Sequence, residues 1–512
     1  MTFTATFSLN YISRDSHRFV NLVARRFDVP LDVLTAPAKS SLLAQCQPAG
    51  LERSRNLEKV GEFSQAAEAV KNSIVLKPRR RSLHFRAEHL DHAVDLFRRI
   101  ELEKAQGSPG PDKTARGGIK VLHLVNNCRP FTTSGYTFRS SKLFEAQAAS
   151  GMEPCALTRY GYPFSIGKFT RKPKTTVEGV TYFHLTPWLF EEAPFGRQEA
   201  MVRAIKQIAR IVRPNVIHTT TPFSNGLIAG EAARRLNIPW VYEVRGEPEA
   251  TWLSKFEPSL YKYAEKSEYF LKAREAEIAC MRAADAVISL SETQRNTLVQ
   301  RGIAKNKITV IPNAIDGGET ERTFSQSNLR LELGLPEESK LIGTVTSLVS
   351  YEGLDLLLEL IARNSKLVGV IVGKGEDLPR LKEIAQELGI ADRVFFPGEI
   401  ANDQVWKWYG AIDVFCIPRI DSWVTRNVTP LKPMQAMALG VPVVASDLPA
   451  LREVTQEREY YFEPGSIDSF ADCVAAALSE NPDERNNRRE AVKTKTWQKA
   501  ARKTRVIYES II

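Results

Sequence analysis

The strongest indication of a fold comes from AIDVFCIPRIDSWVTRNVTPLKPMQAMALGVPVVASDLPALRE, residues 411–453 of the chain. An apolar run from Val414 to Pro418 predicts a strand, and a polar loop follows it. Pro430–Leu439 predicts a helix that Gly440 stops, and Val441–Ala445 predicts a second strand. Strand, loop, helix and strand form a βαβ unit, the arrangement that binds phosphorylated ligands at the C-terminal ends of its strands.

The composition is that of a globular protein with several domains. A length of 512 residues suggests about three domains at roughly 150 residues each, and 43% hydrophobic with 25% charged residues is ordinary. The six cysteines lie far apart and form no CxxC pair. This spacing argues against a disulfide scaffold or a zinc site and fits a reducing compartment.

Charge and hydropathy bear on location and partners. No apolar run reaches the roughly 20 residues of a membrane-spanning helix, and the first residues lack the pattern of a secretory signal. We therefore expect a cytoplasmic protein that also makes peripheral contact with the inner face of the membrane. The net charge of +10 favours an acidic partner, such as nucleic acid, anionic lipid or a nucleoside diphosphate. Nucleic acid is not expected, because no zinc finger, RNP-like motif or basic zipper is present.

The pattern of the chain changes near residue 119. Before it, the sequence reads as mainly helical, and Gly61–Pro78 is an amphipathic stretch with the spacing of one tetratricopeptide helix. A plain helical hairpin is the alternative, since no second copy follows. After it, strands and helices alternate in two series, which predicts two doubly wound parallel sheets. The expected divisions are a helical region (1–105), a linker (106–118), a first Rossmann-like acceptor domain (119–316), a connection (317–337), a second Rossmann-like nucleotide-sugar domain (338–490) and a helix packing back towards the first lobe (491–512).

Several motifs occur in an order that resembles a known family. They are SGYTFRS (134–140), TRYGYP (158–163), YEVRGEPEATWLS (242–254), ADAVISLSE (284–292), VIPNAID (310–316), GKGEDLPRL (373–381), RVFFPGEI (393–400) and the frame from Val428 to Asp447. In this order they resemble retaining GT-B glycosyltransferases of family 4, here with an extra N-terminal helical region. The resemblance implies the α/β GT-B fold of two Rossmann-like domains.

The resemblance also implies where a nucleotide-sugar donor lies. The glycine loop and the following helix N-terminus would face the phosphates, the turn before the second-lobe helix would present backbone amides, and a carboxylate or amide would hold the ribose. The residues carried over as donor-binding are Gly135, Tyr136, Arg139, Gly373, Gly398, Glu399, Ile400, Arg426, Thr429, Pro430, Leu431, Lys432 and Gln435. Pro430, which has no N–H, suits the first turn of the helix.

Five positions depart from the family pattern. The two glutamates that flank the second-lobe helix become Asn427 and Gln435, and the loop that carries an Arg and a Lys has Ser347 and Glu352. Arg245 stands where many members have a histidine; an arginine cannot act as a base at neutral pH but can bind a phosphate or a sugar hydroxyl. Charge on a leaving diphosphate must then come from other cations.

We expect a metal-independent, retaining glycosyltransferase with Arg245 and Asn427 as its catalytic residues. It would need no cofactor beyond a nucleotide-diphosphate sugar as co-substrate, and its acceptor would be a hydroxyl of a glycan or a lipid-linked glycan, in cell-envelope or exopolysaccharide synthesis. A non-catalytic GT-B homologue that binds a partner is the alternative, favoured by the departures above. Basic residues beside amphipathic helices in residues 1–105 suggest a docking surface for a protein or an anionic membrane.

Overall fold

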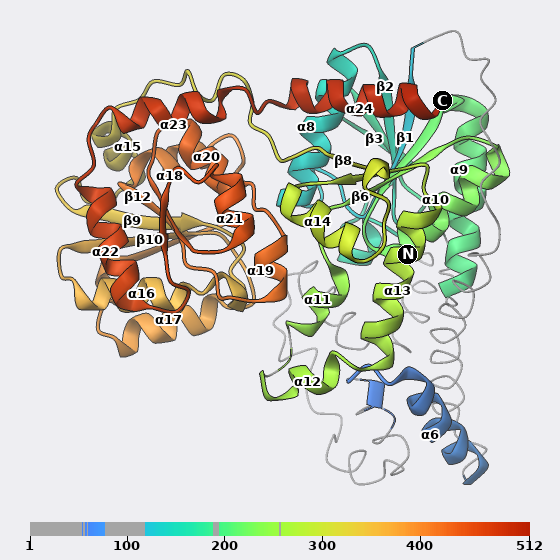
Figure 1. Ribbon diagram of the computed structural model, residues 1–512, viewed down its shortest axis with the longest axis horizontal. Helices are drawn as coiled ribbons and strands as arrows, with labels where there is room; N and C mark the ends of the chain where they lie inside the picture. Colours follow the sequence, from blue (N-terminus) through green and yellow to red (C-terminus); the bar gives the residue numbers. More distant parts are fainter. Residues whose placement is uncertain are drawn as a thin grey trace.

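The protein has two lobes, each built around a parallel sheet (Figure 1). The computed structural model describes residues 118–512 apart from 188–193, 255 and 257, and before them residues 60–76 with Ser54, Leu57 and Glu58. The predicted linker up to residue 117 and most of the predicted helical region before it lie outside the described residues. The prediction of two doubly wound α/β lobes is confirmed.

The first lobe holds an eight-stranded sheet in the order β3-β4-β2-β1-β5-β6-β7-β8. Its strands are β1 (Lys120–Val125), β2 (Glu153–Thr158), β3 (Lys174–Val177), β4 (Val180–Phe183), β5 (Val216–Thr220), β6 (Trp240–Val244), β7 (Ala286–Ser289) and β8 (Ile308–Val310). Its helices are α8 (Gly135–Ala149), α9 (Pro194–Val212), α10 (Phe223–Leu236), α11 (Pro248–Leu253), α12 (Tyr261–Ala264), α13 (Glu268–Ala283) and α14 (Glu292–Gln300). All neighbours pair in parallel except the edge strand β3, which runs antiparallel to β4.

The second lobe holds a six-stranded parallel sheet in the order β11-β10-β9-β12-β13-β14. Its strands are β9 (Lys340–Val345), β10 (Leu367–Val372), β11 (Val394–Gly398), β12 (Val414–Ile417), β13 (Val443–Ser446) and β14 (Tyr460–Phe462). Its helices are α15 (Gln326–Leu333), α16 (Leu354–Arg363), α17 (Leu378–Glu387), α18 (Val405–Ala411), α19 (Trp423–Asn427), α20 (Lys432–Ala438), α21 (Pro449–Val454), α22 (Ile467–Leu478) and α23 (Glu484–Lys493).

Burial explains why the sequence reads as unbroken apolar runs at the strands. Residues of β6 and β10 are buried throughout, as expected of central parallel strands covered by helices on both faces. Leu329 of α15 and Leu335 belong to the second-lobe core. The connection expected over residues 317–337 therefore contains the first helix of that lobe.

The last helix, α24 (Trp497–Ile511), carries the chain from the second lobe back onto α8 of the first (Figure 1). Gln147 donates through Nε2 to Thr504 Oγ1 and to Tyr508 Oη, both at 3.1 Å. Tyr508 Oη also lies 2.6 Å from Nδ1 of His218. These buried polar contacts fix α24 on the first lobe, since each would leave an unpaired polar group if the helix moved away.

Direct contacts between the lobes run through α14, α19 and α21. Glu453 accepts the backbone N–H groups of Glu292 and Thr293 at 2.5 and 2.8 Å, so a second-lobe carboxylate caps a first-lobe helix. Trp423 of α19 donates through Nε1 to Glu247, which also pairs with Arg301 at 2.8 Å. A helix cap and a shared carboxylate therefore contribute to the relative position of the lobes.

The helix predicted within Gly61–Pro78 is α6 (Phe63–Leu76), which lies beside the start of α13 (Figure 1). Among the described residues, no helix is long and apolar enough to cross a membrane.

Candidate active site

A cavity of about 410 Å³ lies between the two lobes. The first lobe contributes the loop after β1 with the start of α8, and Arg245 after β6. The second lobe contributes the residues that follow β9 and β10, and the turn before α20. Both lobes therefore present the C-terminal ends of parallel strands and helix N-termini, which is where α/β folds bind phosphorylated ligands.

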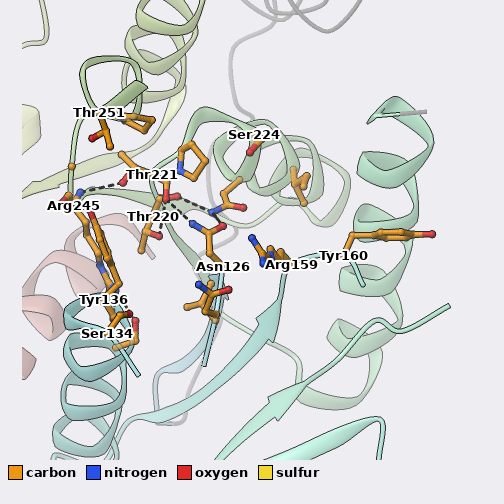
Figure 2. A pocket seen from close by; sticks show the side chains of 18 of the residues that line it. Asn126, Ser134, Tyr136, Arg159, Tyr160, Thr220, Thr221, Ser224, Arg245 and Thr251 are labelled. Atoms are coloured by element: carbon orange, nitrogen blue, oxygen red, sulfur yellow. Dashed lines mark hydrogen bonds between the residues drawn. The ribbon is translucent and has the colours of Figure 1, made fainter. Parts of the chain in front are cut away.

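A larger cavity of about 790 Å³ opens in the first lobe (Figure 2). It shares Ser134, Tyr136 and Arg245 with the interlobe cavity, so these three residues stand between the two spaces. Figure 2 shows them on one wall, with Arg159 and Tyr160 on the opposite side. The two cavities therefore give one space at the lobe junction and one within the first lobe.

Most of the residues carried over from the family line the interlobe cavity. These are Gly135, Tyr136, Arg139, Arg245, Gly373, Glu399, Ile400, Thr429, Pro430, Leu431, Lys432 and Gln435. Gly398, Arg426 and Asn427 do not line it.

The SGYT loop is shaped by a capping box at the start of α8. Thr137 N donates to Ser134 Oγ at 3.3 Å, and Ser134 N donates to Thr137 Oγ1 at 3.0 Å. A Cβ on Gly135 would lie 3.8 Å from Leu431 across the lobes, an ordinary contact. Packing within the protein therefore does not require glycine at this position, and the expected close approach to a donor phosphate stays a prediction. Tyr136 stands next to it and points its hydroxyl towards the carbonyl of Arg245, 3.4 Å away.

Arg139 and Arg245 share one buried carboxylate, Glu243. Arg139 uses all five of its donors: Nε and Nη2 bind Glu243 Oε1, and the others reach Asn313 and two backbone carbonyls. Arg139 is therefore a structural residue, and its expected contact with donor phosphates is corrected, since no N–H is left to donate. Arg245 binds Glu243 Oε2 through Nε and Nη2, both at 2.6 Å, and Ser140 Oγ through Nη1 at 2.6 Å.

Glu243 stays ionised in this setting. Burial alone would raise its pKa, but Arg139 and Arg245 outweigh burial and hold the pKa of Glu243 well below its usual range. His218, 3.6 Å from the same carboxylate, is fully enclosed behind the two arginines, and burial lowers its pKa. It lines neither cavity. The cluster carries two guanidinium charges and one carboxylate, and only Arg245 faces both cavities.

A matching cluster in the second lobe surrounds Glu352, one of the positions where the family has a cation. Arg419 donates to both of its oxygens, at 2.8 and 3.2 Å, and Lys432 Nζ lies 3.3 Å from Oε1. Lys432 also donates to Thr346, which follows β9. Burial raises the pKa of Glu352, but the two cations outweigh it and lower the pKa to about 2. The second lobe thus presents two cations against one carboxylate to the cavity.

The backbone at Gly373, after β10, passes very close to the backbone at Thr346, after β9, beside the residues expected to hold the nucleotide base. Gly373 has φ +139°, and a Cβ there would lie 1.8 Å from the carbonyl oxygen of Thr346. Only glycine fits this position. Gly373 N donates to the carbonyl of Gly398 at 2.9 Å, so Gly398 supports the loop from outside the cavity. Lys374 and Glu399 form an ion pair on the cavity wall.

The turn before α20 differs in detail from the sequence-based expectation. The predicted helix from Pro430 begins instead at Lys432, with Leu431 as its N-cap and Pro433 in the first turn. Pro430 is therefore not a first-turn residue; a second proline takes that role, for which a missing N–H costs nothing. Gln435 lies on α20 with its Oε1 accepting from Tyr409 Oη at 3.1 Å. Its amide N–H groups are the atoms that we expect to donate to a ligand.

Two expected site residues are corrected by their contacts. Asn427, expected to be catalytic, accepts from Thr297 Oγ1 at 2.8 Å and donates to Trp423 O at 3.0 Å. Its side-chain amide therefore contributes to the contact between the lobes. Arg426 pairs with Asp421 through two bonds of 2.5 Å on the exposed surface, outside the residues that line the cavity.

Sequence reasoning left out Thr346, Tyr409 and Asn313, which also line the cavity. Thr346 follows a buried strand, and the strand-end rule could have found it. Asn313, which stands in the VIPNAID motif shortly after β8, could have been found in the same way, whereas Tyr409 on α18 carried no such pattern. Among the described residues, no group of three or more His, Cys, Asp or Glu side chains is arranged to hold a metal ion.

Two family models match the chain side by side. The model described as "Glycosyl transferase 4-like domain" matches residues 134–314, and "Glycosyl transferases group 1" matches residues 325–495. Together they span more than half of the chain, and their border falls between the two sheets.

Curated relatives match in part. An alpha-monoglucosyldiacylglycerol synthase of Streptococcus pneumoniae is 30% identical over 54% of this chain and 62% of its own length. A lipopolysaccharide core mannosyltransferase, LpsB, of Rhizobium meliloti is 30% identical over 34% of this chain and 51% of its own. The chain thus spans 51–62% of the length of these relatives.

Solved structures share the fold. Sucrose-phosphate synthase from Thermosynechococcus elongatus superposes with a TM-score of 0.62 at 19% identity, covering 76% of this chain and 98% of that one. Anabaena HepE in complex with UDP-glucose gives 0.59 at 16% identity, covering 77% and 100%. With its two lobes, the matched models and these relatives, the chain belongs to the GT-B glycosyltransferases described as glycosyl transferases group 1.

Proposed function

We propose that the protein is a retaining glycosyltransferase that moves a sugar from a nucleotide-diphosphate sugar to a hydroxyl of a glycan or lipid-linked acceptor. One observation carries the proposal: Arg245, Arg419 and Lys432 reach the interlobe cavity from three elements of two lobes. Each of these cations is paired with a buried carboxylate that it shares with a second cation. Each cluster therefore has two positive charges and one negative charge, which leaves an excess of positive charge at the cavity. A diphosphate is the anion that this charge suits.

The charge can also serve the chemical step. When the bond from the sugar C1 to the diphosphate oxygen breaks, negative charge develops on the leaving phosphate, and fixed cations stabilise it without a metal ion. The acceptor oxygen then bonds to C1 from the same face, and its proton passes to the departing phosphate oxygen. We therefore expect the transfer rate to be unchanged by EDTA.

The retaining course is supported by what stands between the cavities. The residues that line both are a serine, a tyrosine and an arginine, namely Ser134, Tyr136 and Arg245. None of them can act as a carboxylate or imidazole base at neutral pH. Glu247 also lines the first-lobe cavity, but its Oε2 is bonded to Arg301 and Trp423. A leaving phosphate that takes the proton needs no base at the junction, whereas an inverting transfer would need one.

The two cavities suit the two substrates. The interlobe space would hold the donor, with the ribose at Gln435 and the base near Glu399 and Ile400. The larger first-lobe space would hold the acceptor, because it opens from the same junction. By their names, the two relatives act in glycolipid and lipopolysaccharide synthesis, which supports a role in cell-envelope or exopolysaccharide synthesis. We extend the proposal to action at the inner face of the membrane, where the net charge of +10 would favour anionic lipid.

Calorimetric titration with UDP, GDP, ADP, TDP and CDP tests the proposal. Micromolar binding of one nucleotide is expected, and it would name the donor base. Gln435→Glu provides the companion variant: a carboxylate accepts both hydroxyls of a ribose diol, so affinity for a ribonucleotide should rise severalfold. A folded protein that binds none of the five, with or without the substitution, would favour the non-catalytic homologue.

A further inference from the structure

The first turn of α6 contacts the first lobe through a dense set of polar bonds. Ser64 donates through N to Glu268 Oε2 at 2.7 Å and through Oγ to Glu268 Oε1 at 2.6 Å. Tyr269 N donates to the carbonyl of Gly61 at 2.8 Å. One carboxylate thus caps α6, and the start of α13 is bonded to the residues that precede it.

Gly61 makes this approach possible. Its φ is +87°, and a Cβ would lie 2.7 Å from Ser267 Oγ and 3.0 Å from both Trp252 and Tyr269. The ring of Phe63 adds a contact at 5.7 Å from that of Tyr269. Segment 60–64 therefore packs directly behind two aromatic side chains of the first lobe.

The same two aromatic residues line the first-lobe cavity. Trp252 of α11 and Tyr269 of α13 have ring centroids 4.8 Å apart and face the 790 Å³ space. Aromatic rings bind the apolar C–H face of a sugar ring while neighbouring polar groups bind its hydroxyls. The pair lies in the same cavity as Thr220, Thr221 and Asn225, which supply such polar groups.

We propose that residues 60–64 are positioning residues of the acceptor site: they hold Trp252 and Tyr269 as the wall against which a pyranose ring of the acceptor stacks. This inference rests on the proposed function, since it takes the first-lobe cavity as the acceptor site. Residues 60–64 of the N-terminal region then take part in recognition of the acceptor. Its effect reaches the acceptor through the aromatic pair and leaves the donor site, on the far side of Tyr136, unchanged.

The test measures binding at both sites in full-length protein. Octyl glucoside, galactoside and mannoside serve as acceptor probes and are titrated by calorimetry into protein saturated with the nucleotide identified above. Gly61→Ala should weaken glycoside binding about tenfold, because the added Cβ displaces the pair, while nucleotide affinity stays within about twofold. Ser64→Ala, which removes one bond to Glu268, should weaken it about threefold. Gln65→Ala on the exposed side of α6 is the matched control.

The outcomes separate this inference from the function on which it rests. Unchanged glycoside affinity in folded Gly61→Ala and Ser64→Ala, with nucleotide bound, overturns the inference alone. Wild-type protein that binds nucleotide but none of the glycosides also overturns it. An equal loss of both affinities indicates a structural role for the segment and overturns the positioning role. Wild-type protein that binds neither nucleotide nor glycoside overturns the proposed function together with the inference. If Gly61→Ala does not fold, Ser64→Ala and Trp252→Leu decide.

Discussion

Replacing Glu352 by glutamine should make the protein less stable and yet bind nucleotide more tightly. The carboxylate is 3% exposed and neutralises Arg419 and Lys432. Removing it leaves two neighbouring cations without a counter-ion, and breaking a buried ion pair by deleting one partner costs about 3–5 kcal/mol.

The pKa of Glu352 leads to a similar magnitude. It is lowered from 4.5 to about 2 in the folded protein, where burial opposes the shift and the two cations outweigh burial. Because the folded pKa is depressed, the stabilisation is complete above pH about 4.5 and is lost as the pH falls towards 2. It amounts to about 3 kcal/mol. For a lobe of this size that corresponds to a melting temperature lower by roughly 6–12 °C.

Affinity should change in the opposite direction. With the carboxylate gone, a bound diphosphate no longer faces a like charge beside the cations, and we expect nucleotide affinity to rise about tenfold, or about 1.4 kcal/mol. Thermal melting and calorimetry of Glu352→Gln measure both quantities. Glu332→Gln is the matched control, because its partner Lys407 lies in the same lobe outside the cavity and Glu332 is half exposed. If stability and affinity fall together, or neither changes, the assignment of this cluster to the phosphate subsite is refuted.

Three further predictions follow from single contacts. Burial raises the pKa of Glu277 to about 8, so wild-type unfolding free energy should fall by up to about 4 kcal/mol as the pH rises from 4.5 to 8, and Glu277→Gln should flatten this dependence in denaturant titrations. Lys432→Met should weaken nucleotide binding about 10- to 100-fold in calorimetry, while Arg426→Ala should leave it within about twofold because Arg426 pairs on the surface. Gly373→Ala should lower stability by about 2–4 kcal/mol in thermal melting, since its Cβ would overlap a carbonyl oxygen; an unchanged melting temperature would contradict the backbone geometry.

The elements that the sequence predicted best are the buried parallel strands. The run Val414–Pro418 was predicted as a strand and β12 covers Val414–Ile417, because a strand covered on both faces reads as a continuous apolar run. The edge strand β3 was missed, since Lys174–Val177 is half exposed and polar. The start of α20 was misplaced because Pro430 and Pro433 both suit a first turn, and only the packing decides between them.

Roles of individual charged residues were less predictable than the fold. The sequence places Arg139 in a loop that faces the donor, but its partner Glu243 is 104 positions away, and only the folded sheet brings them together. The family resemblance assigns Asn427 to the catalytic site by its position in the sequence before α20. The helix α19 turns its side chain towards Thr297 in the other lobe, which no local pattern could indicate. Motif position therefore located the cavity, whereas tertiary contacts decided which side chains are available in it.

The balance of charge around the cavity bears on whether this homologue has kept a ligand site. Glu352 stands where the family resemblance implies a cation, which alone would suggest a lost phosphate site. Lys432 and Arg419 nevertheless extend to that carboxylate, and the sum of the three charges remains positive, as it does for Arg139, Arg245 and Glu243. An excess of buried cations costs stability unless an anion binds beside them. A lobe that served only as a scaffold would gain by replacing either extra cation with an apolar residue. Under the proposed function, the diphosphate of a bound donor would supply the anion that offsets the positive charge of both clusters.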